Sequence, residues 1–110
     1  MSEVNDTIKR LNVGSITDTE ETIFDYTSGA VVKTILISNI TTIEQTLVLN
    51  IDGAKFIHII PSNTTISLTD YFICNILKAK LTTESQTDEE GNPIVNTINY
   101  HISGIQLGDS

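Results

Sequence analysis

The stretch TLVLNIDGAKFIHII, from Thr46 to Ile60, decides the fold class of this 110-residue chain. Two runs in which apolar and polar residues alternate flank the dipeptide Asp52-Gly53. Alternation with a period of two is typical of a β-strand with one buried face, and Asp-Gly readily adopts the left-handed backbone of a two-residue hairpin turn. The stretch therefore predicts a β-hairpin, whose outer side faces either water or another molecule.

The two strands of this hairpin differ in how clearly they assign residues to the core. In the first strand Leu47, Leu49 and Ile51 share one face, while the other face is mainly polar. The return strand is apolar on both faces, so two orientations remain open for it. The core face of the return strand carries either Ile57 and Ile59 or Phe56, His58 and Ile60.

Strand-like runs separated by turn residues recur from Thr22 onward. They predict an all-β fold, an antiparallel β-sandwich (Ig-like or jelly-roll-like) of about seven to eight strands with an N-terminal arm. The run Val31–Asn39 is apolar on both faces and is expected to be central, while Thr27–Ala30 (TSGA) is expected to be a turn. The alternation of the last run shifts at Gly104, which predicts a β-bulge there. The other expected strands are Thr22–Thr27, Asn63–Leu68, Leu77–Thr82 and Ile94–Leu107.

The chain divides into an N-terminal segment and one domain. Residues 1–21 are polar and acidic with a few apolar residues at mixed spacing, which predicts an arm or a short helical turn. Residues 22–110 are expected to form the β-sandwich domain, and a chain of this size buries roughly two thirds of its unfolded surface. Residues 83–93 (TESQTDEEGNP) lack aliphatic and aromatic side chains, so they predict an exposed, acidic hairpin tip.

The charge balance argues against a nucleic-acid partner. The formal net charge is −8, whereas binding to a phosphate backbone depends on clustered Lys and Arg side chains. The basic residues form no such cluster along the sequence, and a lysine on the solvent side of a strand has a simpler role, because it discourages edge-to-edge aggregation. The basic residues are Lys9, Arg10, Lys33, Lys55, Lys78 and Lys80.

No set of catalytic, cofactor-binding or metal-binding residues can be nominated, so we expect a protein that is not an enzyme. Cys74 has apolar neighbours, which favours a buried thiol over a nucleophile. His58 and His101 each lie within a strand-like run and are expected to be packed or solvent-facing, because no carboxylates at ligand spacing accompany them. The acidic tip Asp88 to Glu90 does not match the EF-hand spacing, and cation binding there stays open.

The compartment is expected to be a cytoplasm. A single cysteine cannot form an internal disulfide, so an oxidising compartment is not required. The N-terminal MSEVNDTIKRLN lacks the basic and then apolar order of a signal peptide. No apolar run approaches the about 20 residues that a membrane-spanning helix needs, so no membrane partner is expected.

Five motifs, in this order, resemble a known class of proteins: KTILISN, LVLNIDG, IIPSNTTISLTD, LKAKLTT and YHISGIQL. Over Val31 to Leu107 the chain is similar to the small β-sandwich structural proteins of tailed bacteriophage virions. The resemblance implies a non-enzymatic virion component of the capsid-decoration, head-fibre, neck or tail-associated type. It further implies assembly in the host cytoplasm as a homo-oligomer, with a trimer favoured, and contacts with capsid, neck or tail subunits. The acidic tip and the N-terminal segment depart from the common pattern.

A carbohydrate-binding or adhesion module on a β-sandwich is the alternative function. Sugar recognition usually needs exposed aromatic rings for stacking, yet aromatic residues make up only 5% of the chain and Trp is absent. This alternative therefore depends on Tyr26, Tyr71 and Tyr100 gathering on one exposed face.

Overall fold

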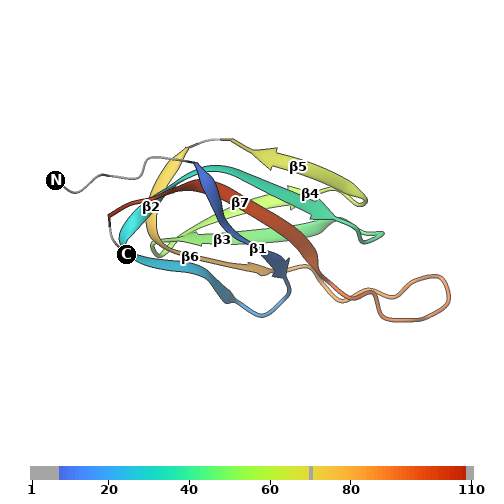
Figure 1. Cartoon of the computed structure of the whole chain (residues 1–110). Helices are drawn as coiled ribbons and strands as arrows, with labels where there is room; N and C mark the ends of the chain where they lie inside the picture. Colours follow the sequence, from blue (N-terminus) through green and yellow to red (C-terminus); the bar gives the residue numbers. More distant parts are fainter. Residues whose placement is uncertain (1–7, 70, 109–110) are drawn as a thin grey trace.

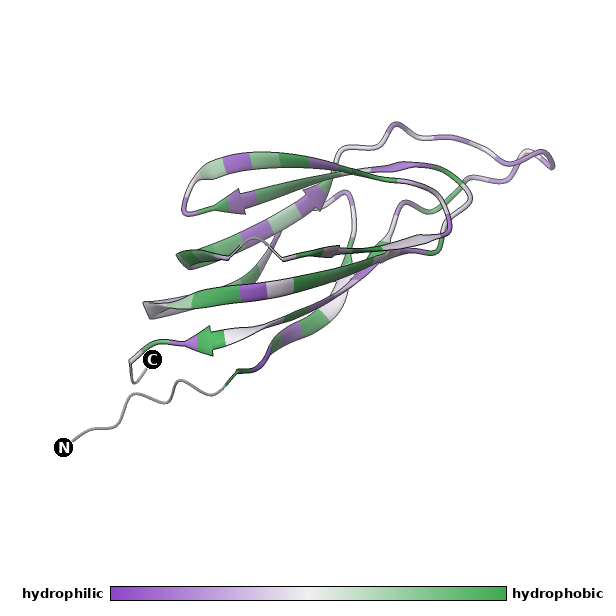
Figure 2. Ribbon diagram, turned by 90° about the horizontal axis from the view of Figure 1, so that it is seen from above, coloured by the Kyte–Doolittle hydropathy of each residue, from purple (hydrophilic) through white to green (hydrophobic). Residues whose placement is uncertain are grey.

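Seven antiparallel strands form an all-β, sandwich-like fold in the computed structural model, which describes residues 8–69 and 71–108 (Figure 1). Apolar and polar residues alternate along several of the ribbons (Figure 2), as expected for strands that bury one face. The strands are β1 (Lys9–Ile16), β2 (Glu21–Asn39), β3 (Gln45–Ile51), β4 (Ala54–Ile60), β5 (Thr64–Leu68), β6 (Phe72–Leu81) and β7 (Ile98–Gln106).

The 19-residue strand β2 joins the two layers of the fold. Its hydrogen-bonded neighbours change along its length: β6 pairs with the segment 21–32, whereas β7 pairs with 30–38 and β5 with 35–39. One layer therefore contains β4, β3, β6 and the first half of β2, and the other contains β1, β7, the second half of β2 and β5. The expected central position of Val31–Asn39 is confirmed, because this half of β2 has partners on both sides.

The expected turn at Thr27–Ala30 is wrong, because β2 runs through this segment as one strand. The register against β6 shifts between Asp25 and Ala30, and Gly29 has a φ of 87°. The left-handed backbone at this glycine bends the strand instead of reversing it. Asn75 of β6 donates hydrogen bonds from its side-chain amide to the carbonyl oxygens of Tyr26 and Thr27 at 3.2 and 2.8 Å, so the bend keeps its backbone acceptors satisfied.

The N-terminal segment also differs from the expected arm or short helical turn. Residues 9–16 form β1, which pairs antiparallel with β7 and matches Ile16 with Ile98. Only Ile16 of this strand is fully buried, while Asn12 and Gly14 occupy other inward positions. The sequence of β1 therefore shows little alternation of apolar and polar residues. Asn12 is nevertheless suited to its inward position, because its side-chain amide donates a 2.6 Å hydrogen bond to the Ile23 carbonyl oxygen. The part of the expected arm at residues 1–7 lies outside the described residues.

The hairpin at Asp52-Gly53 is confirmed, with φ of 51° and 94° at its two turn residues. The return strand follows the second orientation, because Ile60 is buried and the Ile57 and Ile59 side chains are 68% and 58% exposed. Of the other two residues expected on the core face, His58 is half-buried and Phe56 stays 49% exposed. The expected inward face of the run after Asn75 is also confirmed, since Leu77, Ala79 and Leu81 are buried. The largest fully buried apolar side chains are Ile35, Ile37, Leu47, Ile60, Leu77, Leu81, Ile98 and Ile102.

The predicted bulge at Gly104 is misplaced by one strand. The extra residues lie in the neighbouring strands: Lys33 of β2 lies opposite Ser103–Gly104, and Leu11 of β1 lies opposite Ile102–Ser103. Gly104 itself keeps its place in the alternation and is buried. A Cβ atom there would lie 2.0 Å from the carbonyl oxygen of Val31, so the glycine allows β2 and β7 to approach closely.

We predict that Gly104→Ala lowers the free energy of unfolding by about 3 kcal/mol or more, because the atom that blocks the new methyl group belongs to the backbone of β2. Urea unfolding followed by circular dichroism measures the change. Ser103→Ala, on the same strand, is the control and is expected to change the free energy of unfolding by less than about 1 kcal/mol. Equal stability of the two variants would contradict the close approach of the strands.

Candidate interaction surface

The two histidines lie far apart in the strand order. His58 is on β4 at one end of the order, and His101 is on β7 near the other end. Within residues 8–69 and 71–108, no group of three or more His, Cys, Asp or Glu side chains is arranged to hold a metal ion. In the same part of the chain, no helix is long and apolar enough to cross a membrane.

Cys74 is a buried thiol, as expected from its neighbours, with 1% of its surface exposed. Burial raises the pKa of the thiol from 9.0 to about 12, and the nearby negative charge of Asp52 adds to this increase. A thiol with so high a pKa carries almost no thiolate at neutral pH, and the thiolate is the nucleophilic form. The position of Cys74 is therefore that of a core residue.

The three tyrosines do not gather on one exposed face. Tyr100 is buried, and burial together with the charge of Glu21 raises its pKa. The Tyr26 ring stacks on Phe24 with 4.8 Å between ring centroids and is half-buried. Tyr71 is 67% exposed, and the Lys33 ammonium lies 4.6 Å from the centroid of its ring. The arrangement that a sugar-binding surface requires is thus absent from these rings.

Outward-facing side chains of β4, β3 and β6 form a regular grid, because the three strands pair in register. Ile57 of β4 lies beside Val48 of β3, and Val48 lies beside Lys80 of β6. Alternation fixes the direction, since the residues between them, such as Leu49, face the core. We call this grid the outer β4–β3–β6 face. Its three rows are Ile59, Thr46 and Thr82; Ile57, Val48 and Lys80; and Lys55, Asn50 and Lys78.

The apolar part of this face lies at the edge of the layer. Among the described strands, β4 has β3 on one side and none on the other. Ile57 and Ile59 are both exposed there, whereas Val48, which lies between Ile57 and Lys80, retains 8% exposure although it points outward. Adjacent exposed isoleucines on an edge strand form an apolar patch of the kind that marks a contact surface. The lysines of the face flank this patch.

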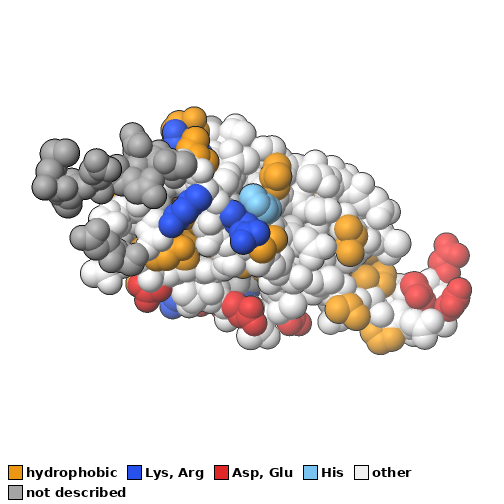
Figure 3. Space-filling view, in the orientation of Figure 1, with side chains coloured by type: hydrophobic (Ala, Val, Ile, Leu, Met, Phe, Trp, Pro, Cys, Tyr) orange, Lys and Arg blue, Asp and Glu red, His pale blue; other side chains and the backbone are white. Residues whose placement is uncertain are grey.

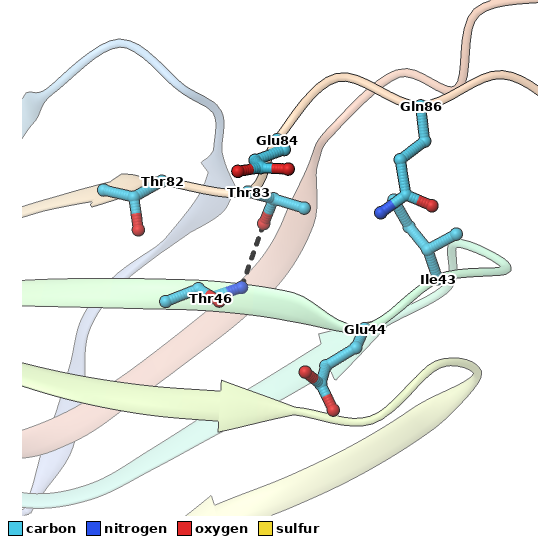
Figure 4. Close-up of a pocket in the computed structure, with 7 residues that line it drawn as sticks. All are labelled: Ile43, Glu44, Thr46, Thr82, Thr83, Glu84 and Gln86. Carbon is cyan, nitrogen blue, oxygen red and sulfur yellow. Dashed lines mark hydrogen bonds between the residues drawn. The ribbon is translucent and has the colours of Figure 1, made fainter.

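An acidic groove adjoins the same face at the end nearer the loop 82–97. The cavity has a volume of about 530 Å³ and opens between the start of β3 and the loop (Figure 4). Glu44 and Glu84 border it, and the Thr46 backbone N–H donates a 2.9 Å hydrogen bond to the Thr83 hydroxyl at its wall. Thr46 also belongs to the outer face, so the groove continues the rows of the grid.

A buried network of side-chain amides holds this end of the sandwich. Asn39 is 1% exposed, and its amide group donates to the carbonyl oxygens of Ile43, Ile60 and Pro61 at 2.9 to 3.0 Å. Its side-chain oxygen accepts hydrogen bonds from the backbone N–H and the hydroxyl of Thr41. One side chain thereby connects the end of β2, the loop before β3 and the end of β4.

Gln45 extends the network to the long loop. This side chain is fully buried, donates to Thr41 and Asn96 at 3.1 Å, and accepts a 2.6 Å hydrogen bond from the Thr83 hydroxyl. Asn96 in turn donates to the Thr83 carbonyl oxygen. The loop therefore leaves the sandwich from a fixed base, and its two ends are joined to β3.

The acidic tip is exposed, as predicted for residues 83–93, and its acidic side chains gather at one end of the molecule (Figure 3). Its turn is well defined, because the Asp88 carboxylate accepts hydrogen bonds from the backbone N–H groups of Glu90 and Asn92, both at 2.9 Å. Gly91 has a φ of 84° and donates its N–H to the Asp88 carbonyl oxygen. These contacts account for the sequence DEEGN as a turn.

Sequence reasoning identified the acidic tip and the lysines on strands but missed the buried amides. Asn39 and Gln45 are polar residues at strand ends, and such positions are usually exposed. One feature of the sequence could have indicated the network. Asn39 and Gln45 flank a short loop that contains two Thr residues, whose hydroxyl groups can both donate and accept hydrogen bonds.

We predict that Asn39→Ala costs about 3 kcal/mol in the free energy of unfolding, because it leaves several buried backbone groups without their partner. Asn99→Ala is the matched control: Asn99 is exposed and accepts one hydrogen bond from Ser15. We expect the control to cost about 0.5 kcal/mol. Similar losses in denaturant unfolding of both variants would show that the network contributes little.

We predict that ionisation of Cys74 destabilises the fold at alkaline pH. The protonated thiol is neutral, and its pKa is higher in the folded state than in the unfolded chain. The contribution of the neutral thiol to the free energy of unfolding is therefore complete below pH 9.0 and is lost as the pH rises toward about 12. The loss approaches about 1.4 kcal/mol per pH unit for one proton. The test compares the pH dependence of unfolding for the wild type and Cys74→Ala from pH 7 to 11; Tyr100 acts in the same direction in both proteins. Parallel curves would contradict the prediction.

Comparison with known proteins gives no family for this chain. No protein-family model matches it, and no curated protein matches its sequence. The resemblance to small virion proteins therefore stays a prediction from the motifs in Val31 to Leu107.

Proposed function

We propose that the protein is a non-enzymatic structural component of a bacteriophage virion, of the capsid-decoration, head-fibre, neck or tail-associated type. In this role it is assembled in the host cytoplasm and acts through contacts with its own copies and with capsid, neck or tail subunits. The motifs between Val31 and Leu107 support this role, and the surface of the sandwich supplies a means of contact.

The observation that carries the proposal is the exposure of Ile57 and Ile59 on the edge strand β4. A β-branched apolar pair on an edge strand favours aggregation, and proteins usually avoid it or cover it. Coverage by a neighbouring subunit removes about 25 cal/mol of unfavourable hydration for each Å² of apolar surface buried. The pair is therefore better suited to an assembled particle than to an isolated monomer.

The loop 82–97 supplies a second kind of contact. Its tip carries Asp88, Glu89 and Glu90 on exposed positions and projects from one end of the sandwich (Figure 1). The amide network fixes the base of the loop, so little conformational freedom is lost there when the tip binds. Its charge favours a basic surface on another virion protein.

We predict that this chain is present in purified tailed-phage particles from the source of its gene. Quantitative mass spectrometry of particles banded on a density gradient should find it at a constant ratio to the major capsid protein, because structural subunits occupy symmetry-related positions. Soluble host proteins in the same gradient are the control for contamination. Recovery of the chain only with those soluble proteins would overturn the proposed role.

A further inference from the structure

The outer β4–β3–β6 face carries opposite charges at its two ends. Lys55 and Lys78 occupy the row nearest the Asp52-Gly53 turn. Beyond the last paired row, Glu44, which precedes β3, and Glu84, which follows β6, border the acidic groove. The exposed isoleucines lie between these ends. Along the strand direction the face therefore runs from Lys55 and Lys78, through the isoleucines and Lys80, to the acidic groove.

None of these charges is neutralised within the described part of the chain. Lys55, Lys78, Glu44 and Glu84 form no ion pair with a described residue at 4.0 Å or less. Each side chain can thus pair with a partner without first breaking an ion pair to a described residue. A partner that fits must be acidic where this face is basic, and basic where this face is acidic.

We propose that the face binds a second copy of this chain across a two-fold axis. The axis lies in the plane of contact, perpendicular to the strands, and passes between the rows of Ile57 and Ile59. Rotation by 180° about this axis reverses the strand direction in the second copy. The acidic end of each copy therefore meets the basic end of the other. A two-fold contact of this kind uses the same patch on both subunits and closes at two copies.

The register of the strands determines which side chains then meet. Ile59 of each copy faces Ile57 of the other, so the two isoleucine pairs cover each other. The same rotation brings Glu84, which follows β6, toward Lys78 of the second copy. It brings Glu44, which precedes β3, toward the row that holds Lys55 and Lys78. One operation pairs both the apolar and the charged parts of the face, and this agreement favours self-association over an unrelated partner.

This inference goes beyond the proposed virion role and does not depend on it, because it concerns contact between two copies in isolation. The face spans only three strands, so we expect a small interface and a dimer that dissociates on dilution. A capsid-like trimer, if it forms, must use other surfaces.

Sedimentation equilibrium of the full chain over roughly 5 to 500 µM tests the inference, since weak interfaces give dissociation constants in this range. We expect a monomer–dimer equilibrium whose dissociation constant rises by about 30-fold or more in Ile57→Asp. Ile73→Asp is the matched control, because Ile73 is 67% exposed against 68% for Ile57 but lies on β6 outside the grid. A monomeric wild type at every concentration, or a dimer that Ile73→Asp dissociates and Ile57→Asp does not, overturns the inference.

Charge exchange tests the two-fold geometry separately. Lys78→Glu and Glu84→Lys should each weaken the dimer by about tenfold, because each places like charges opposite one another. A mixture of the two variants should restore it, since both contacts then join a lysine to a glutamate. If the mixture associates no better than either variant alone, the pairing of Glu84 with Lys78 is wrong. Circular dichroism of each variant separates loss of the dimer from loss of the fold, and none of these results bears on the presence of the chain in particles.

Discussion

The buried side-chain amides of Asn39 and Gln45 are the constraint on which the loop end of the sandwich depends. Four segments meet there, namely the end of β2, the start of β3, the end of β4 and the base of the loop 82–97. Apolar packing alone does not set the relative positions of such segments, because it has no direction. Hydrogen bonds from two amide groups do, and they satisfy backbone groups that burial would otherwise leave unpaired.

The base of the loop and the outer face are consequences of the same arrangement. Thr83 accepts a hydrogen bond from Thr46 and donates one to Gln45, so it joins the buried network to a residue of the outer face. The groove between Glu44 and Glu84 lies over this junction. The acidic end of the face is thus held by the core. Its basic end depends on the pairing of β3, β4 and β6 and on the Asp52 carboxylate, which accepts hydrogen bonds from the backbone N–H groups of Asn75 and Ile76. The position of the acidic groove on this surface therefore depends on the hydrogen bonds that join the loop 82–97 to β3.

Much of the fold could be predicted where a local pattern was strong. The hairpin at Asp52-Gly53 and the inward face of Leu77 and Leu81 follow from strict alternation and from a dipeptide suited to a left-handed turn. β1 was missed because its inward positions hold Asn12 and Gly14, which are not apolar signals.

The remaining errors arose from contacts between strands. Gly29 produces a bend where a turn was expected, and Gly104 is required by the backbone of Val31, a residue 73 positions earlier in the chain. For the candidate surface, the sequence identified lysines on strands and exposed acids. Their gathering on one face also depends on the pairing of β3 with β6, which are distant in the sequence.

The membership of β2 in both layers makes the sandwich a single mechanical unit. In a sandwich whose layers share no strand, one sheet can slide over the other or separate from it while each keeps its own hydrogen bonds. Here such a movement must break the ladders that β6 and β7 both form with residues 30–32. Shear between the layers is therefore resisted by backbone hydrogen bonds as well as by side-chain packing, so a load applied to the face of one layer is transmitted directly through β2 to the other.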